Sequence, residues 1–358
     1  MPKVLVFSDI HIAAHKRSTE RLQHCIDALV WVFQTAIEKN IKHILFCGDL
    51  FQERQKIDVQ TYQKAFEVFE SYVPKNDLKI YLLLGNHDLW HMQKWDISSV
   101  IPFRCIPGVT VVDKPCTLDV AGHPVSFLPY THNPAEDLSG IVNNGKLKIL
   151  CGHIAIDGSV LNTMHQTHAE VEIEHDGDMV KVDAKVLAGW DHVFLGHYHG
   201  QQKVGSNAEY IGSTLQLSFG EAFQHKHILI FDLETAEKEY IRNTFSPQHF
   251  IIPQKDIAKY DLNGNFVKIV VDDIGRSDLV DLRNDILSNN KVGTLEFRSA
   301  EKKVDESLVE NAKEILIKDG EMLDKYIEMQ SEDTLKGLDK TFLLDIGRQI
   351  CNDMASSK

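Results

Sequence analysis

Residues 80–88 read IYLLLGNHD, an apolar run that ends in a glycine followed by Asn86, His87 and Asp88. A short, continuous apolar run is typical of a strand buried on both faces, as in a parallel sheet covered by helices. Polar residues after such a strand lie at the edge of the sheet where α/β folds bind ligands. We therefore expect a central strand over 80–84 and a functional crevice at its carboxyl end.

The segments before this strand repeat its pattern. Residues 4–7 and 43–47 are further apolar runs, and residues 19–39 and 58–72 carry apolar side chains at helical spacing. An order of strand, helix, strand, helix and strand predicts an α/β fold with crossover connections.

From about residue 109 the pattern changes to shorter, closely spaced strands, which predict a second sheet packed on the first. The expected strands are 109–112, 117–120, 125–128, 148–151, 192–195, 209–211 and 227–232.

The last third of the sequence predicts two further parts. Residues 246–253 contain two prolines and are interpreted as a linker. Strands over 266–271 and 294–298, with a helix capped by Ser277 or Asp278 between them, predict a small α+β unit. Apolar residues at helical spacing predict a helical tail. The expected domains are 1–247, 254–303 and 304–358.

Composition restricts the class of protein. The chain has 358 residues, more than the usual single domain, and a net charge of −14, which disfavours broad, non-specific nucleic-acid binding. The N-terminus shows no signal-peptide pattern and no apolar run reaches the ~18 residues of a membrane span, so we expect a cytoplasmic protein. The cysteines form no CxxC pair and are expected to be buried free thiols.

Potential metal ligands follow five of the expected strands, and in four of the five a glycine precedes the ligand. The segments are Asp9-Ile10-His11, Gly48-Asp49, Gly85-Asn86-His87-Asp88, Gly152-His153 and Gly196-His197-Tyr198-His199. Glycine allows a sharp turn and a close approach of the backbone to an ion. Oxygen and imidazole ligands without thiolate suit manganese, iron or zinc. Two such ions ~3.5–4 Å apart can clamp a phosphate, so the pattern predicts a two-metal phosphoesterase.

Each element alone has a simpler interpretation. Asp9 or Asp49 would be a cap or loop carboxylate, His153 a core histidine, and Gly-Asn-His-Asp a turn. The ordered set of five favours the metal site. His165 and His168 have ligand-like spacing, but no apolar strand precedes them, so we do not expect them to be ligands.

The ordered motifs D-x-H, GD, GNHD, GH and GHxH resemble the calcineurin-like metallophosphoesterase superfamily. GDLF at 48–51 and Tyr210-Ile211-Gly212-Ser213 are more narrowly similar to SbcD, the nuclease subunit of a double-strand-break repair complex. Residues 48–54 (GDLFQER) and the compact length resemble most the bacteriophage recombination endonuclease subunits. The resemblance implies a two-sheet αββα sandwich, and the layout of the C-terminal part resembles that family's capping domain and ATPase-binding helices.

The resemblance also implies roles for the site residues. One divalent ion, expected to be Mn²⁺, would be bound by Asp9, His11, Asp49 and His199. The second would be bound by Asp49, Asn86, His153 and His197, with Asp49 as the bridge. His87 would not be a ligand; it would stabilise the transition state and protonate the leaving oxygen, which suits the pKa of imidazole. Asp88 either orients His87 or is a turn carboxylate.

The implied activity is that of a manganese-dependent DNA nuclease with 3′-to-5′ exonuclease and single-strand endonuclease activity. The implied partners are DNA and an SbcC-like coiled-coil ATPase, with a homodimer inside a heterotetramer. The family often has a histidine shortly after GDLF, where this chain has Gln52, which bears on its action on duplex ends. Arg17, Arg54 and Lys56 are candidate phosphate contacts, or solvated surface charges.

Two alternatives remain open at this point. A phosphatase or small-nucleotide phosphodiesterase of the same superfamily is one; the protein phosphatases carry Asp-Arg-Gly and a final Glu where this chain has Glu53-Arg54-Gln55 and Asp88. The other is a non-catalytic scaffold that docks an ATPase, which the complete ligand set disfavours.

Overall fold

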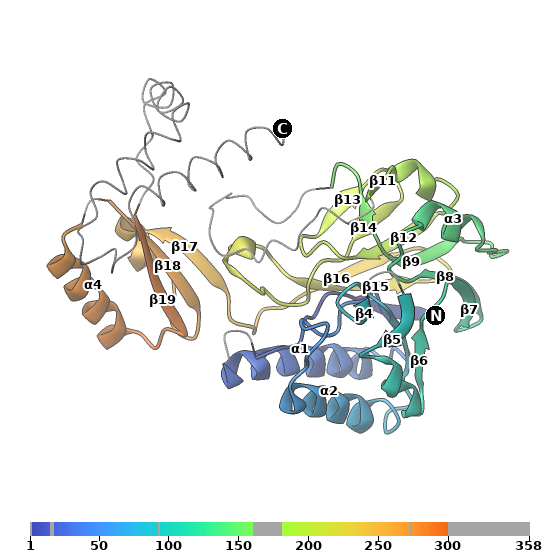
Figure 1. Cartoon of the computed structure of the whole chain (residues 1–358), viewed down its shortest axis with the longest axis horizontal. Helices are drawn as coiled ribbons and strands as arrows, with labels where there is room; N and C mark the ends of the chain where they lie inside the picture. The colour runs from blue at the N-terminus through green and yellow to red at the C-terminus, as the bar shows by residue number, and fades with distance from the viewer. Residues whose placement is uncertain (1, 15–17, 92–93, 160–180, 273, 300–358) are drawn as a thin grey trace, which may run out of the picture. The chain divides into compact units, whose positions relative to one another are not determined.

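The structure is a computed structural model that describes residues 2–14, 18–91, 94–159, 181–272 and 274–299. Its main feature is a pair of six-stranded sheets in a mixed α/β arrangement (Figure 1). The predicted α/β class is confirmed.

The first sheet carries the three strands predicted in the N-terminal part. Its strand order is β16-β15-β1-β2-β3-β6. The bounds are β1 Lys3–Phe7, β2 His43–Phe46, β3 Lys79–Leu83, β6 Val109–Val112, β15 His227–Asp232 and β16 Lys238–Arg242. Strands β1, β2 and β3 are parallel, with Leu5 opposite Ile44 and Ile44 opposite Ile80. The carboxyl ends of the three strands therefore lie level at one edge.

Two amphipathic helices, α1 (Thr19–Glu38) and α2 (Val59–Tyr72), cover one face of this sheet (Figure 1). Ser18 caps α1 by accepting the Arg21 amide at 3.2 Å, and Asp58 caps α2 by accepting the Thr61 amide at 2.9 Å. Buried residues from both helices form one hydrophobic cluster with the sheet, in which Phe33 packs edge to face against Phe69.

The second sheet has the order β13-β14-β12-β9-β8-β7. The bounds are β7 Cys116–Val120, β8 His123–Leu128, β9 Ile149–His153, β12 His192–Gly196, β13 Gln202–Val204 and β14 Ala208–Tyr210. Strands β9 and β12 are parallel, with His153 opposite Gly196. A turn at Ala121 and Gly122 joins β7 to β8.

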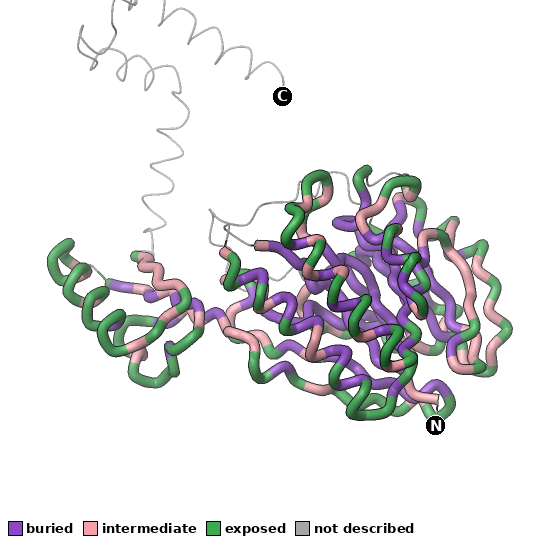
Figure 2. Tube along the Cα trace, turned by 90° about the horizontal axis from the view of Figure 1, so that it is seen from below, coloured by how far each residue is buried: buried purple, intermediate pink, exposed green. Residues whose placement is uncertain are grey.

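A buried apolar layer joins the two sheets. Figure 2 shows the buried residues in purple, and most of them lie in the interior of the trace. Val6 and Leu83 of the first sheet share this layer with Phe127 and Phe194 of the second. The outer face of the second sheet packs against Leu138 of α3 (Pro134–Ser139) and Leu187 of the 3-10 turn η4 (Ala184–Leu187). The αββα order is thus present, with short helices on the second sheet in the described part of the chain.

The small α+β unit has its own sheet, in the order β17-β18-β19. Its elements are β17 His249–Pro253, the 3-10 turn η6 Gln254–Lys259, β18 Phe266–Val271, α4 Arg276–Asn289 and β19 Thr294–Ser299. A separate hydrophobic cluster fills it, including Ile252, Ile269 and Ile286. The expected linker at 246–253 is wrong for residues 249–253, because the backbone of these residues pairs with β18 and forms an edge strand.

The remaining elements are short. They are β4 Leu89–His91, β5 Lys94–Ser98, the 3-10 turns η2 Ile101–Cys105 and η5 Phe219–Glu221, β10 Ala155–Ile156 and β11 Lys181–Val182. Cys25, Cys47 and Cys151 are buried free thiols as expected, whereas Cys105 is exposed. The predicted tail at 304–358 lies outside the described residues. Within the described ranges, no helix has the length and apolar character needed to cross a bilayer.

Candidate metal centre

The predicted site residues come from five strand ends in two different sheets, and the structure brings them together. Asp9 and His11 follow β1, Asp49 follows β2, Asn86 and His87 follow β3, His153 ends β9, and His197 and His199 follow β12. The His197 amide donates to Asp9 Oδ1 at 2.9 Å, and His153 Nδ1 donates to the Cys47 carbonyl at 2.7 Å. These bonds join the edges of the two sheets at the centre.

The backbone around the centre adopts unusual conformations. Asp9, His11, Asp49 and His197 have positive φ angles of 49°, 47°, 63° and 101°. Non-glycine residues rarely adopt such angles, and those that do are often held there by the structure around a functional site. Strands β1, β2 and β12 therefore end in sharp turns that direct side chains toward the centre.

Glycine is required at two of these turns. A Cβ atom on Gly48, whose φ is +101°, would lie 2.4 Å from Nδ1 of His153. On Gly85 it would lie 2.0 Å from Oδ1 of Asp49. The glycines that precede the polar residues therefore make room for those side chains to approach one another.

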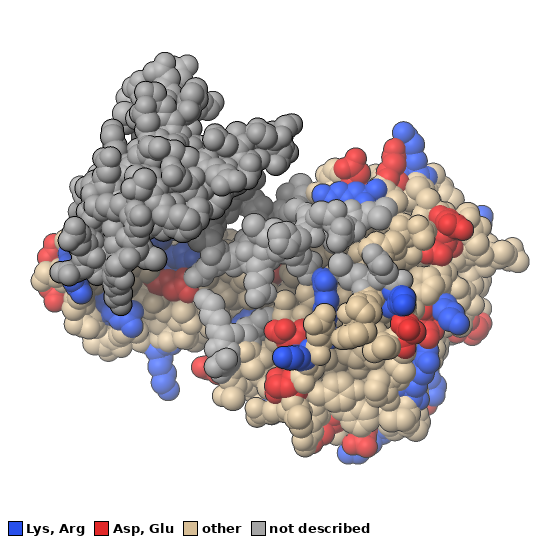
Figure 3. All heavy atoms as spheres, in the orientation of Figure 1, with Lys and Arg blue, Asp and Glu red and all other residues tan. Residues whose placement is uncertain are grey.

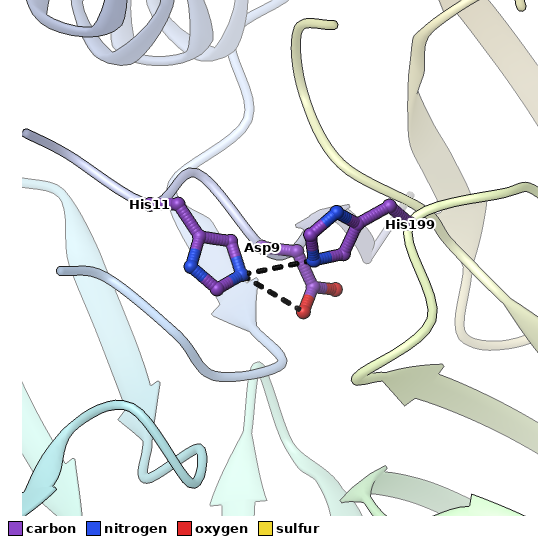
Figure 4. A group of neighbouring side chains, drawn as sticks. All are labelled: Asp9, His11 and His199. Carbon is purple, nitrogen blue, oxygen red and sulfur yellow. Dashed lines mark hydrogen bonds and ion pairs between the residues drawn. The ribbon is translucent and has the colours of Figure 1, made fainter. Parts of the chain in front are cut away.

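Asp9, His11 and His199 form a first group that could hold a metal ion (Figure 4). His11 Nε2 lies 3.1 Å from His199 Nε2 and 3.9 Å from Asp9 Oδ1. One donor atom from each of the three side chains lies within 4.8 Å of the others.

A second group surrounds His153 and includes Asp9 and Asp49. Asp49 Oδ2 lies 3.3 Å from His153 Nε2. Asn86 Oδ1 lies 2.9 Å from the same nitrogen and 3.0 Å from Nδ1 of His197. The side chains predicted to bind a second ion are therefore neighbours.

Asp49 also belongs to a third possible group, with His11 and His87. Its Oδ2 is 3.5 Å from His11 Nε2, and its Oδ1 accepts the His87 amide at 2.8 Å. Asp49 thus reaches both sides of the centre, as a bridging ligand must. The His87 imidazole also has a ligand atom within 4.8 Å of those of His11 and Asp49.

Hydrogen bonds donated by Nδ1 determine which nitrogen of three imidazoles faces the centre. His153 donates from Nδ1 to the Cys47 carbonyl, His87 to the Gln52 carbonyl at 2.7 Å, and His199 to the Glu221 carboxylate at 2.8 Å. A proton on Nδ1 leaves Nε2 with the lone pair that binds a metal or exchanges a proton.

Electrostatics in the centre favour a cation. Burial lowers the pKa of His153, but the carboxylates of Asp49 and Asp9 outweigh burial and raise the pKa to about 9. Burial opposes ionisation of Asp49 as well, yet the charges of His153 and His87 hold its pKa well below the usual range. The centre therefore holds positive charge between buried carboxylates, and a metal ion that binds there displaces protons.

The residues present fit a divalent cation. The donors are carboxylate and amide oxygens and imidazole nitrogens, the set that suits manganese, iron or zinc. Asn86 is buried with its oxygen in the centre, while its Nδ2 has no hydrogen-bond partner among the described residues. Leaving an amide nitrogen unsatisfied costs free energy, and a ligand role for the oxygen accounts for this orientation.

Asp88 takes the simpler of its two predicted roles. Its carboxylate accepts the backbone amides of Asp49, Leu50 and Gly85, each at 2.9 Å. Burial and the nearby charge of Asp49 raise its pKa to about 7. Asp88 therefore ties the β2 turn to the β3 turn, and the Gln52 carbonyl is the group that orients His87.

Sequence reasoning missed three contributors to the centre: the Gln52 carbonyl, Glu221 and Lys226. A backbone carbonyl has no residue-type signal. Glu221 and Lys226 do not directly follow an apolar strand, which is the pattern that identifies the other site residues.

The candidate DNA contacts are only partly described. Arg17 lies outside the described residues, as do His165 and His168. Arg54 is half-buried and Lys56 is exposed, and both follow the Asp49 turn within a few residues. On the coloured part of the face in Figure 3, basic and acidic side chains are interspersed.

Comparisons with known proteins agree with this geometry. The family model described as calcineurin-like phosphoesterase matches residues 2–204. The chain is 23% identical over 281 residues to "Exonuclease subunit 1" of Enterobacteria phage T4, covering 77% of this chain and 78% of the relative. It is 30% identical over 196 residues to the SbcD nuclease subunit of Staphylococcus epidermidis, covering 48% and 49%. The chain thus aligns with about half the length of the second relative.

Among solved structures, an archaeal phosphodiesterase matches 67% of this chain and 99% of its own, at 12% identity and a TM-score of 0.33.

Proposed function

Because this chain belongs to the calcineurin-like phosphoesterase family, whose model spans residues 2–204, we propose that it is a metal-dependent nuclease that hydrolyses phosphodiester bonds in DNA. The observation that carries the proposal is the meeting of carboxylate, amide and imidazole donors from both sheets around Asp49. The relatives named as exonuclease and nuclease subunits support DNA as the substrate. The activity would be 3′-to-5′ exonuclease and single-strand endonuclease, in DNA repair, recombination or replication.

In this proposal two ions, Mn²⁺ by preference, occupy the centre. The ligands of the first are Asp9, His11, Asp49 and His199, and those of the second are Asp49, Asn86, His153 and His197. When bound, such ions stabilise the charge that develops on the phosphate and help to generate a nucleophile at neutral pH. Asp49 is the ligand common to both positions, supported by its reach to His11 and to His153.

The chain's own contribution to proton transfer is assigned to His87. Its Nδ1 donates to the Gln52 carbonyl, so Nε2 is the nitrogen that can carry a proton toward the leaving oxygen. Its backbone amide is fixed by Asp49, so the imidazole has a defined position next to the candidate ligands. Arg54 and Lys56 are proposed to position phosphates of the strand.

The proposal predicts metal-dependent cleavage of DNA. The purified chain should cut plasmid and single-stranded DNA in the presence of Mn²⁺, and removal of metal by a chelator should abolish cutting until Mn²⁺ is restored. Hydrolysis of a generic phosphomonoester, nitrophenyl phosphate, should be slower under the same conditions. Gel analysis of DNA and absorbance of nitrophenol provide the two measurements.

The same assay distinguishes the alternatives. Rapid hydrolysis of the monoester without DNA cleavage would identify a phosphatase. Mn²⁺ binding without turnover of either substrate would favour the scaffold. Parallel titrations with Fe²⁺ and Zn²⁺ identify the metal that supports the highest rate.

We also propose that the chain is one subunit of a larger complex, as the names of these two relatives say of them. The proposed partner is an SbcC-like coiled-coil ATPase held by the tail at 304–358, with two copies of this chain in a heterotetramer. Deleting 304–358 should abolish co-purification with that ATPase and leave Mn²⁺-dependent cleavage intact. The milder variant Phe342→Ser replaces one of the apolar side chains at helical spacing in the tail, and it should weaken co-purification. If the truncated chain is insoluble and Phe342→Ser destabilises the isolated protein, the tail packs internally.

A further inference from the structure

His199 has a buried carboxylate on the side of its ring that faces away from His11. Nδ1 of His199 donates to Glu221 Oε1 at 2.8 Å, while Nε2 lies 3.1 Å from His11 Nε2 (Figure 4 shows the latter contact). Glu221 ends the 3-10 turn η5, in the connection between β14 and β15. Glu221 therefore contacts one ring nitrogen of His199, while the other ring nitrogen faces the proposed metal position.

The second oxygen of Glu221 is held by three donors. Oε2 lies 2.6 Å from Nζ of Lys226 and accepts from Ser213 Oγ at 3.1 Å and from the Leu217 amide at 3.2 Å. Lys226 also donates to the carbonyl of His199 at 2.9 Å. The side chains of Glu221 and Lys226 are 3% and 5% exposed, so the pair is a fixed part of the interior.

This arrangement differs from that of two neighbouring imidazoles. His153 and His87 donate from Nδ1 to backbone carbonyls. His199 donates to a full negative charge instead. A carboxylate on the far nitrogen of a ligand imidazole holds the ring in place, holds the proton on Nδ1 and makes Nε2 a stronger ligand.

We propose that Glu221, held by Lys226, is a positioning residue for His199 that strengthens metal binding at the position formed by Asp9, His11 and His199. Glu221 does not touch the metal or the substrate; it acts through the imidazole. The inference rests on the proposed function, since it assigns a supporting residue to one of the two proposed ion positions. It also implies that a substitution can weaken metal binding at one of the two positions and leave the other unchanged.

Manganese binding to the purified full-length chain, measured by calorimetry and by electron paramagnetic resonance without DNA, tests the inference. Glu221→Gln keeps the size of the side chain and removes its charge. It should weaken one of the two Mn²⁺ sites by about 10- to 100-fold, the usual effect of removing such a partner, and leave the other unchanged. In a His199→Ala background, Glu221→Gln should cause no further loss, because its effect passes through His199.

Glu209→Gln is the matched control. Glu209 is also buried and pairs with a lysine, Lys238, but it lies on β14 and contacts Tyr240 instead of a candidate ligand. This variant should leave both sites unchanged. If Glu221→Gln does not fold because Lys226 is left as an unpaired charge, the double variant Glu221→Gln, Lys226→Gln removes both charges and allows the same measurement.

Unchanged binding at both sites in a folded Glu221 variant would overturn the inference. Equal weakening of both sites, or a further loss on the His199→Ala background, would overturn it too. The proposed function fails separately: a wild-type chain that binds two Mn²⁺ ions but cuts no DNA is not the proposed nuclease, whereas the binding test of Glu221 still gives its answer.

Discussion

Replacing Asp49 by alanine is expected to remove manganese binding and DNA cleavage together. Asp49 is a member of two of the groups that could hold a metal, and its Oδ2 lies within 3.5 Å of both His11 and His153. Stabilisation of a phosphate by a bound ion is worth several kcal/mol. Since about 1.4 kcal/mol corresponds to a tenfold change in rate, turnover should fall by ~10³-fold or more.

Calorimetric titration with Mn²⁺ checks the binding part of this prediction, and the plasmid assay checks the rate. Asp232→Ala is a suitable control, because Asp232 is equally buried but accepts the turn amides of Glu234 and Thr235 away from the candidate ligands. The control should bind two ions. An Asp49→Ala chain that still binds two ions would show that this carboxylate does not bridge them.

Replacing His87 by glutamine or alanine is expected to slow cleavage and to keep both ions. Nδ1 of His87 is held by the Gln52 carbonyl, which leaves Nε2 to deliver a proton. Losing a positioned general acid usually costs ~10²–10⁴ in rate. The variant should still bind DNA, since the other residues of the centre are untouched.

A substrate that needs less protonation tests this role of His87. A nitrophenyl phosphodiester has a better leaving group than DNA, so the rate loss of the variant should be smaller on that ester. Equal losses on both substrates would mean that His87 is not the acid. Loss of an ion would mean that His87 is a ligand, as its place in a group with His11 and Asp49 allows. His123→Gln, on a partly exposed side chain of the β7–β8 hairpin, should cut at the wild-type rate.

The strands around the centre were predictable because their signal is local. A strand buried on both faces needs a continuous apolar run, and β1, β2 and β3 lie within one or two residues of the predicted ranges. Strand β17 was missed because its local sequence indicates a different structure. Two nearby prolines are typical of a linker, and only pairing with β18 shows that residues 249–253 form an edge strand. The exposed hairpin of β4 and β5 has no apolar run to reveal it.

The sequence by itself determined which residue types follow which strands, and thereby the class of chemistry. Asp9, Asp49 and His153 are adjacent to buried strands, and parallel strands bring their carboxyl ends to one edge. Only the tertiary structure decided how these side chains are held.

Three of the contacts that hold the site residues in place join segments far apart in the chain. Asp88 binds the backbone of the Asp49 turn, the Gln52 carbonyl orients His87, and Glu221 supports His199. A backbone carbonyl is present in every residue type, so the sequence cannot single one out. A carboxylate in a loop is equally hard to single out before folding brings it against an imidazole. The candidate ligands could therefore be predicted from their positions directly after strands in the sequence. The groups that orient them could not, because their contacts form only when the folded chain brings distant segments together.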